Sequence, residues 1–267
     1  MTTVSGRGWT MHCGDAFAVM PTLAKVEHVM TDPPFEVEAH TKARRALVDS
    51  TQKRGAENTG KVLRIDQPLE ICFPAITAEE RARAGEMFAG LVSRWAIAFC
   101  QIEAVASWRE ALVAGGLEWV RGGIWRKPDG APQFTGDRPG QGFESLAIAH
   151  PRGRKRWSGG GKHAVWTHAL EHGHGNGARN EHPTQKPIGL MLELVEDFTD
   201  RGETILDPFA GSGSTGVAAL RRGRCFIGIE REPRFFELAC ERLRAEENGI
   251  SLEAARAGQA PLFGGAG

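Results

Sequence analysis

The chain has 267 residues, 41% of them hydrophobic and 25% charged, and its formal net charge at pH 7 is zero. These values are typical of a soluble globular protein with one large domain, with or without a small inserted one, and the overall charge indicates no particular partner. No apolar run reaches the roughly eighteen residues of a membrane span, and the start of the chain lacks the apolar core of a signal peptide, so we expect a cytoplasmic protein.

The first third of the chain combines short strands with a long polar segment. Strands are predicted at residues 9–13 and 26–31, and Pro33 and Pro34 end the second one. Residues 36–66 are polar and have little periodicity, so we predict a long mobile loop there.

The rest of the chain alternates helices with strands. A capping box of Thr77 and Glu80 begins a helix, and later helices are predicted at 103–116, 186–200, 214–223 and 233–249. Strands are predicted at 95–100, 118–125, 144–150, 203–209 and 225–230. This alternation indicates an α/β fold with a mainly parallel sheet.

Cysteine and charge patterns narrow the classes of function. Five cysteines occur singly, and an odd count without a C-x-x-C pair argues against a disulfide framework and a structural zinc site. Basic residues outnumber acidic ones between Arg121 and Lys162, and a second basic stretch begins at His40. Local basic surface suits a bound polyanion, although a solvated loop explains the charges equally well.

A glycine-rich turn joins the strand at 203–209 to the next helix. Gly211, Gly213 and Gly216 fit the pattern G-x-G-x-x-G, and Glu230 ends the following strand, as in a dinucleotide fingerprint. The residues after Glu230 are too few for a second mononucleotide-binding half, so we expect a single nucleoside with a short appendage. Asp207, before the loop, would repel a phosphate but could receive an ammonium group.

Three motifs together resemble a known family. They are DPPF at Asp32, HPTQKP at His182 and DPFAGSGSTG at Asp207. In this order they resemble the S-adenosylmethionine-dependent amino-methyltransferases of DNA, with the permuted motif order of the β class, from Asp15 to about Arg244.

The resemblance implies a fold and a domain organisation. We expect a Rossmann-like sheet of seven mostly parallel strands with flanking helices, in which 118–125 and 144–150 form an antiparallel hairpin. DPPF and the glycine loop would lie at adjacent strand ends. The catalytic domain would span residues 1–249, with a small target-recognition insert at about 152–180 and a flexible tail at 250–267.

The resemblance also assigns catalytic roles. Asp32 would accept a hydrogen bond from the exocyclic amine of a base, and the carbonyl of Pro33 a second one. Pro33 and Pro34 would keep these acceptors preorganised. Phe35 would stack on a base swung out of the helix. The family usually has tyrosine at that position, so the stacking face is kept and the phenol hydrogen bond is lost.

The cofactor implied is S-adenosyl-L-methionine. Asp15 would contact its adenine, the HPTQKP segment would close over its methionine end, and Lys186 would pair with its carboxylate. The full set of implied cofactor-binding residues is Asp15, Asp32, His182, Thr184, Lys186, Asp207, Pro208, Phe209, Gly211, Ser212, Gly213, Ser214, Thr215 and Glu230.

Two further groups of residues suggest roles in DNA recognition and in metal binding. Trp157, Trp166 and the basic residues from Arg152 to Arg156 lie where the family reads its DNA target. The histidines His168, His172 and His174, with Glu171, could hold a metal, but the family needs none, so we expect no metal and a DNA-facing loop.

The leading function is methylation of adenine N6 in DNA, because aspartate in the catalytic motif favours adenine in this family. Methylation of cytosine N4 and an inactive DNA-binding protein with the same fold are the alternatives; a nicotinamide oxidoreductase fails on length and on DPPF. The partner is DNA, no membrane is expected, and a homodimer and a paired restriction enzyme are left open. The family implies a bacterial or phage-encoded protein.

The end of the chain carries one more motif. Residues Gln259 to Phe263, QAPLF, resemble the short peptide with which bacterial proteins dock on the replication sliding clamp. The alternative is that Leu262 and Phe263 fold back onto the protein's own surface, and a match of five residues arises easily by chance.

Overall fold

A computed structural model of the chain describes residues 1–35, 75–130, 136–171 and 185–258. The predicted mobile loop at 36–66, His172, His174, His182, Thr184 and the clamp-like peptide at 259–263 lie outside the described residues. Within the described residues, no helix is long and apolar enough to cross a bilayer.

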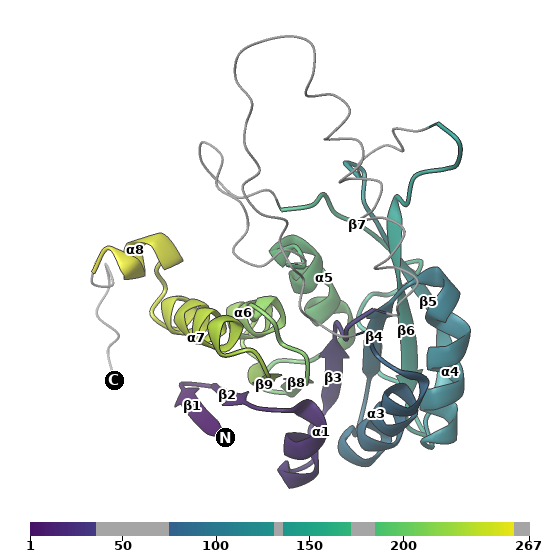
Figure 1. The fold of residues 1–267 in the computed structure, drawn as a ribbon, viewed down its shortest axis with the longest axis horizontal. Helices are drawn as coiled ribbons and strands as arrows, with labels where there is room; N and C mark the ends of the chain where they lie inside the picture. The colour runs from purple at the N-terminus through teal and green to yellow at the C-terminus, as the bar shows by residue number, and fades with distance from the viewer. Residues whose placement is uncertain (36–74, 131–135, 172–184, 259–267) are drawn as a thin grey trace.

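One sheet organises the described part of the chain (Figure 1). Its nine strands run in the order β1-β2-β9-β8-β3-β4-β6-β5-β7. The strands are β1 (Thr2–Gly6), β2 (Trp9–Cys13), β3 (His28–Thr31), β4 (Ala96–Cys100), β5 (Glu118–Arg126), β6 (Phe143–His150), β7 (Val165–Thr167), β8 (Thr204–Asp207) and β9 (Cys225–Glu230).

The prediction of an α/β fold with a mostly parallel sheet is confirmed. Strands β2, β9, β8, β3 and β4 are parallel neighbours, and β6 runs antiparallel to both β4 and β5, as expected for the hairpin. Seven strands were expected, and the two additional ones lie at the edges: β1 pairs with β2 and β7 with β5. Both are short and largely exposed, so neither carries the apolar run that predicts a strand.

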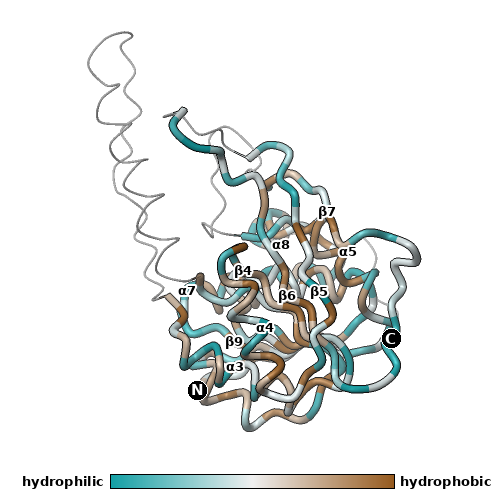
Figure 2. The backbone as a smooth tube through the Cα atoms, turned by 90° about the vertical axis from the view of Figure 1, so that its right-hand side faces the viewer, coloured by the Kyte–Doolittle hydropathy of each residue, from teal (hydrophilic) through white to brown (hydrophobic). Residues whose placement is uncertain are grey.

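Helices cover both faces of the sheet and enclose two apolar cores. The helices are α1 (Ala16–Val19), α3 (Ala78–Leu91), α4 (Val105–Ala114), α5 (Ile188–Phe198), α6 (Ser214–Arg221), α7 (Pro233–Glu247) and α8 (Leu252–Arg256). One core contains Phe88 of α3 and Trp108 of α4, and the other contains Leu194 of α5 and Leu243 of α7. Figure 2 shows the hydrophobic residues concentrated along the strands between these layers.

Local sequence signals explain where key helices begin. Thr77 and Glu80 form both bonds of the predicted capping box of α3. In the segment predicted as a flexible tail, residues 252–256 instead form α8. Ser251 caps this helix by accepting a hydrogen bond from Ala254 N at 3.0 Å, and Arg256 pairs with Glu241 of α7 at 2.7 Å.

Candidate active site

Two adjacent strand ends bring the catalytic motif and the glycine loop together. Strands β3 and β8 are parallel neighbours, so Asp32, directly after β3, and Asp207, the last residue of β8, lie at the same edge of the sheet. Thr31 Oγ1 donates a hydrogen bond to Asp207 Oδ1 at 2.7 Å and ties the two ends together. The predicted adjacency of DPPF and the glycine loop is confirmed. One pocket at this edge is lined by all four residues of DPPF and by Asp207 to Ser212.

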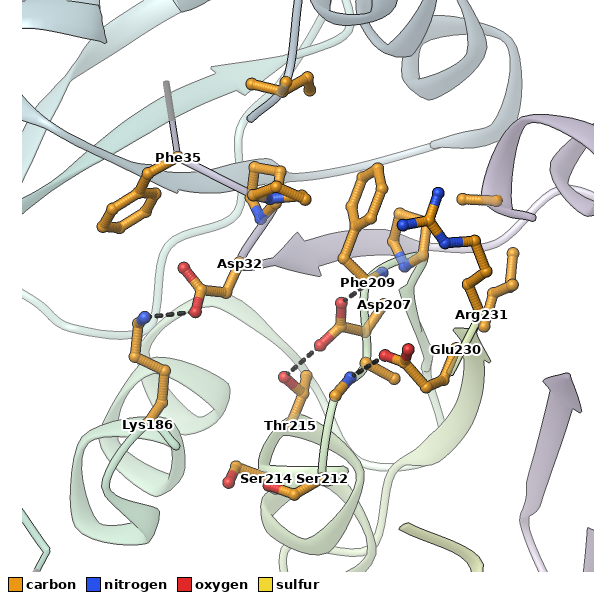
Figure 3. Close-up of a pocket in the computed structure, with 18 of the residues that line it drawn as sticks. Asp32, Phe35, Lys186, Asp207, Phe209, Ser212, Ser214, Thr215, Glu230 and Arg231 are labelled. Atoms are coloured by element: carbon orange, nitrogen blue, oxygen red, sulfur yellow. Dashed lines mark hydrogen bonds and ion pairs between the residues drawn. The ribbon is translucent and has the colours of Figure 1, made fainter. Parts of the chain in front are cut away.

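The two carboxylate oxygens of Asp32 have different surroundings (Figure 3). Oδ2 pairs with the ammonium of Lys186. Oδ1 is buried and receives no hydrogen bond from any described residue. Desolvation raises the pKa of Asp32, and the charge of Glu144 adds to that rise, while Lys186 opposes it. The side chain is 24% exposed and lines the pocket, so it can still reach a ligand.

Lys186 belongs to a chain of alternating charges that includes two residues not predicted for the site. Its ammonium lies 3.2 Å from Glu144 Oε2, and Lys127 Nζ lies 2.5 Å from Glu144 Oε1. Burial favours a lower pKa for Lys186, but Asp32 and Glu144 outweigh it and raise that pKa. Burial likewise favours a higher pKa for Glu144, but Lys186 and Lys127 lower it. The ammonium of Lys186 therefore stays charged between two carboxylates.

Aromatic rings flank this charge. The Lys186 ammonium lies 5.1 Å from the centre of the Phe99 ring and 5.5 Å from that of Phe35, within the range of cation–π attraction. Lys186 was predicted to pair with the cofactor carboxylate, and that assignment stays a prediction. In the described structure its charge is shared by Asp32 and Glu144.

The glycines of the loop meet steric demands that larger residues would not. Gly211 and Gly213 have positive φ angles of 53° and 79°, and Gly213 is the N-cap of α6. A Cβ on Gly216 would lie 2.6 Å from the ring of Phe226 on β9, so this glycine permits close packing of helix on strand. Ser212 and Ser214 are buried in the same turn, and Ser212 Oγ accepts a hydrogen bond from Arg242 of α7 at 2.9 Å.

Both carboxylate oxygens of Asp207 accept hydrogen bonds within the protein. Its Oδ1 accepts hydrogen bonds from Thr31 and from Phe209 N, and its Oδ2 accepts one from Thr215 Oγ1 at 2.6 Å. Burial raises its pKa to about 6 despite these bonds. Each oxygen is thus committed to a structural bond, and the side chain is only 2% exposed. These contacts favour a role in holding the loop over the earlier suggestion that Asp207 receives an ammonium group.

Glu230 connects the glycine loop to the end of β9. Its Oε2 accepts a hydrogen bond from Gly211 N at 2.8 Å, and its Oε1 accepts one from Glu232 N at 2.8 Å. Burial raises the pKa of Glu230. A carboxylate can accept about four hydrogen bonds, and the residue lines the pocket, so Glu230 can also accept from a ligand hydroxyl.

Another part of the pocket lining is mainly aromatic and apolar. Asp15 lines it but also caps α1, since its Oδ1 accepts a hydrogen bond from Ala18 N at 3.1 Å. Phe17 and Phe209 meet edge to face at 6.2 Å between ring centres. Pro208 also lines the pocket. Phe17 was not predicted for the site, and a single aromatic residue in a short helix gives no signal that could have found it.

The residues expected to read DNA lie away from this pocket. Trp166 is 1% exposed, and its Nε1 donates to Asp197 of α5 at 2.8 Å; Trp157 packs on Phe198. Lys155 pairs with Glu118 at the beginning of β5, and Arg156 lies 3.5 Å from Asp200 shortly before β8. The segment from Arg152 to Arg156 therefore lies at the opposite edge of the sheet, because antiparallel β6 carries the chain there. Its expected role in reading the DNA target stays a prediction.

The histidine-rich segment offers no metal site within the described residues. His168 Nε2 lies 2.5 Å from Glu193, and Glu171 accepts a hydrogen bond from Ile188 N at the beginning of α5. No group of three potential metal ligands occurs in the described part of the chain.

Comparison with known proteins gives a match to one family model. Residues 123–241 match the family model described as DNA methylase, N6_N4_Mtase. The match spans 119 of the 267 residues, less than half of the chain. Over 66 residues the chain is 52% identical to the Type II methyltransferase M2.DpnII of Streptococcus pneumoniae. That alignment spans 25% of each chain, so the match covers about a quarter of the length of this curated relative.

Solved structures resemble this chain over most of its length. The crystal structure of an M1.HpyAVI–SAM complex is 24% identical, covers 88% of this chain and 98% of its own, and gives a TM-score of 0.63. The PvuII DNA methyltransferase, described as cytosine-N4-specific, is 14% identical, covers 96% and 92%, and gives a TM-score of 0.66. At these identities the likeness concerns the fold.

Proposed function

We propose that this protein transfers a methyl group from S-adenosyl-L-methionine to N6 of an adenine swung out of DNA. The observation that carries the proposal is Asp32 Oδ1, a buried acceptor without a donor among the described residues. It faces the pocket that the glycine loop and Glu230 also line. An exocyclic amine is the donor that such an acceptor suits.

The pocket has the features that the cofactor would need. Gly211 lines the pocket and lets a ligand approach the backbone, and Glu230 can still accept from ribose hydroxyls. Asp15, Phe17 and Phe209 form the wall beside which a nucleoside base fits. The cofactor supplies an activated methyl group on a sulfonium, so the protein has mainly to align the amine.

The chain's own residues would align and deprotonate that amine. Asp32 Oδ1 accepts a hydrogen bond from it, the carbonyl of Pro33 accepts a second one, and Phe35 stacks on the base. The nitrogen gains the methyl group and loses one proton. Asp32 is a suitable acceptor for this proton because burial raises its pKa.

Transfer of radioactive label tests the proposal. The protein is incubated with DNA and methyl-tritiated S-adenosyl-L-methionine, and the DNA is digested to nucleosides. We expect the label in N6-methyladenine. Label in N4-methylcytosine would support the alternative base. DNA binding without transfer of label would identify an inactive DNA-binding protein.

A further inference from the structure

Glu144 lies near Asp32, the proposed proton acceptor, yet it has no role in the proposed methyl transfer. It is the second residue of β6, at the edge where β3 and β8 end, and it lines the same pocket as Asp32. Its side chain is 16% exposed and pairs with a lysine on each side, Lys127 at 2.5 Å and Lys186 at 3.2 Å. A carboxylate held so closely by one buried and one half-buried ammonium group has a defined position.

The four charges alternate along a row. Lys127 follows β5, Glu144 is on β6, Lys186 precedes α5, and Asp32 follows β3. Lys186 is the shared member, because its ammonium contacts both Glu144 and Asp32 Oδ2. Without the Glu144 carboxylate, the Lys186 ammonium would interact more strongly with Asp32. A carboxylate neutralised by a desolvated ammonium is a weaker acceptor for a substrate amine.

We propose that Glu144 is a positioning residue for the methyl transfer. Glu144 holds the Lys186 ammonium against Asp32 Oδ2 and partly neutralises the charge of that ammonium. Asp32 Oδ1 then stays oriented toward the pocket as an acceptor for the amine. The role in transfer rests on the proposed function, whereas the effect on Asp32 does not. Lys186 is then a support for Asp32 in place of a ligand for the cofactor carboxylate.

The charged groups that face Asp32 fix the expected direction of the effect. From the described elements they are Lys186, Glu144, Lys127 and, at the end of β8, Asp207. Glu144 raises the pKa of Asp32, and Lys127 lowers it. Removal of the Glu144 charge should therefore lower the Asp32 pKa, and removal of the Lys127 charge should raise it. Loss of packing would not produce two shifts of opposite sign.

The same hairpin supplies a matched control. Glu118 begins β5 and pairs with Lys155 at 2.7 Å, at the opposite edge of the sheet. Glu118→Gln therefore makes the same chemical change in a carboxylate–lysine pair far from the pocket. Glu144→Gln keeps the size of the side chain and one of its two acceptor oxygens, so it removes the negative charge with little change in shape.

The first measurement uses the ligand-free protein. Carbon-13 NMR follows the titration of the Asp32 carboxyl, which is assigned by its disappearance in Asp32→Asn. We expect a lower Asp32 pKa in Glu144→Gln, a higher one in Lys127→Gln and no change in Glu118→Gln. An Asp32 pKa that stays the same or rises in Glu144→Gln would overturn the inference. If Glu144→Gln does not fold, Lys127→Gln decides by the same criterion with the opposite sign.

The second measurement is the pH profile of kcat for transfer of label to DNA. Glu144→Gln should lower kcat at least about tenfold, on the scale of losing a support for an active-site group, and it should move the acidic limb to lower pH. A kcat within about twofold of wild type, or an unmoved acidic limb, would contradict the role. If the wild-type protein transfers no label at all, the proposed function fails, and the NMR titration alone decides the effect of Glu144 on Asp32.

Discussion

At the scale of single residues, the main feature of the site is that the two oxygens of the Asp32 carboxylate have different surroundings. One oxygen is held by Lys186, and the other is a buried acceptor that no described residue uses. A buried acceptor without a partner costs free energy in the folded state. Such a cost is typical of a functional site, where a ligand supplies the missing partner.

Replacing Asp32 should therefore affect turnover much more than cofactor binding. We expect Asp32→Ala to lower kcat at least about 100-fold, comparable with the loss of one transition-state hydrogen-bond partner. The affinity for S-adenosyl-L-methionine should change far less, because the glycine loop and Glu230 stay intact. Single-turnover kinetics and equilibrium binding separate the two effects. Turnover like that of wild type in this variant would contradict the mechanism.

Asp207 provides a prediction about stability and pH. Burial raises its pKa from 3.8 to about 6, so the folded protein binds this proton more tightly than the unfolded chain does. The ionised group then costs about 3 kcal/mol of folding free energy above pH 6, and this cost disappears as the pH falls below 3.8. Relative to Asp207→Asn, the wild-type protein should gain about 2 kcal/mol of stability between pH 7 and pH 4. Urea unfolding at several pH values measures the difference, and parallel curves would refute it.

At the scale of elements, glycines decide how closely helices pack on one face of the sheet. A Cβ on Gly85 of α3 would lie 2.3 Å from the carbonyl oxygen of Ala111 in α4, so the two backbones touch directly. The carbonyl cannot move without breaking its own helix. Gly90 of the same helix has open space where a Cβ would lie.

The two positions predict opposite effects of one substitution. Gly85→Ala should lower the free energy of unfolding by about 1–3 kcal/mol through overpacking. Gly90→Ala should raise it by about 0.5–1 kcal/mol, because alanine is the better helix former. Chemical denaturation measures both, and an equal effect at the two positions would contradict the packing account.

Elements with a local signal were predictable from the sequence. The capping box at Thr77, the glycine loop at Gly211 and the apolar strands β4, β8 and β9 each occupy one continuous stretch. The edge strand β7 was not predicted, because three residues in a glycine-rich and histidine-rich segment are shorter than any periodicity. Its pairing with β5 depends on the tertiary fold.

At the scale of the whole molecule, the order and direction of the strands bring together residues that are far apart in the sequence, and no local pattern predicts these contacts. Lys186 and Asp32 are 154 positions apart and meet only because α5 begins beside the end of β3. Glu144 carries no motif, so nothing local marked it. The basic charge of the segment from Arg152 to Arg156 is visible in the sequence, but the direction of β6, which carries this segment to the edge opposite the pocket, is not.

The edges of the sheet should therefore differ in DNA binding. Arg126 ends β5 at the edge of the pocket and is exposed, whereas Arg154 is exposed at the opposite edge. We expect Arg126→Ala to weaken DNA binding and to reduce the salt dependence of log K by about one unit of slope, as for loss of one phosphate contact. Arg154→Ala should leave both unchanged. Equal losses of DNA affinity in the two variants would mean that DNA does not bind preferentially at the edge of the sheet that carries the pocket.

Methylation-aware sequencing of DNA from cells that express the protein tests the central claim most directly, because it reports the modified base and its position together. The wild-type protein should place N6-methyladenine at one recurring short sequence, and Asp32→Ala, expressed to the same level, should leave that sequence unmodified. DNA without modified adenine in the wild-type cells, or the same modification in the Asp32→Ala cells, would contradict the account.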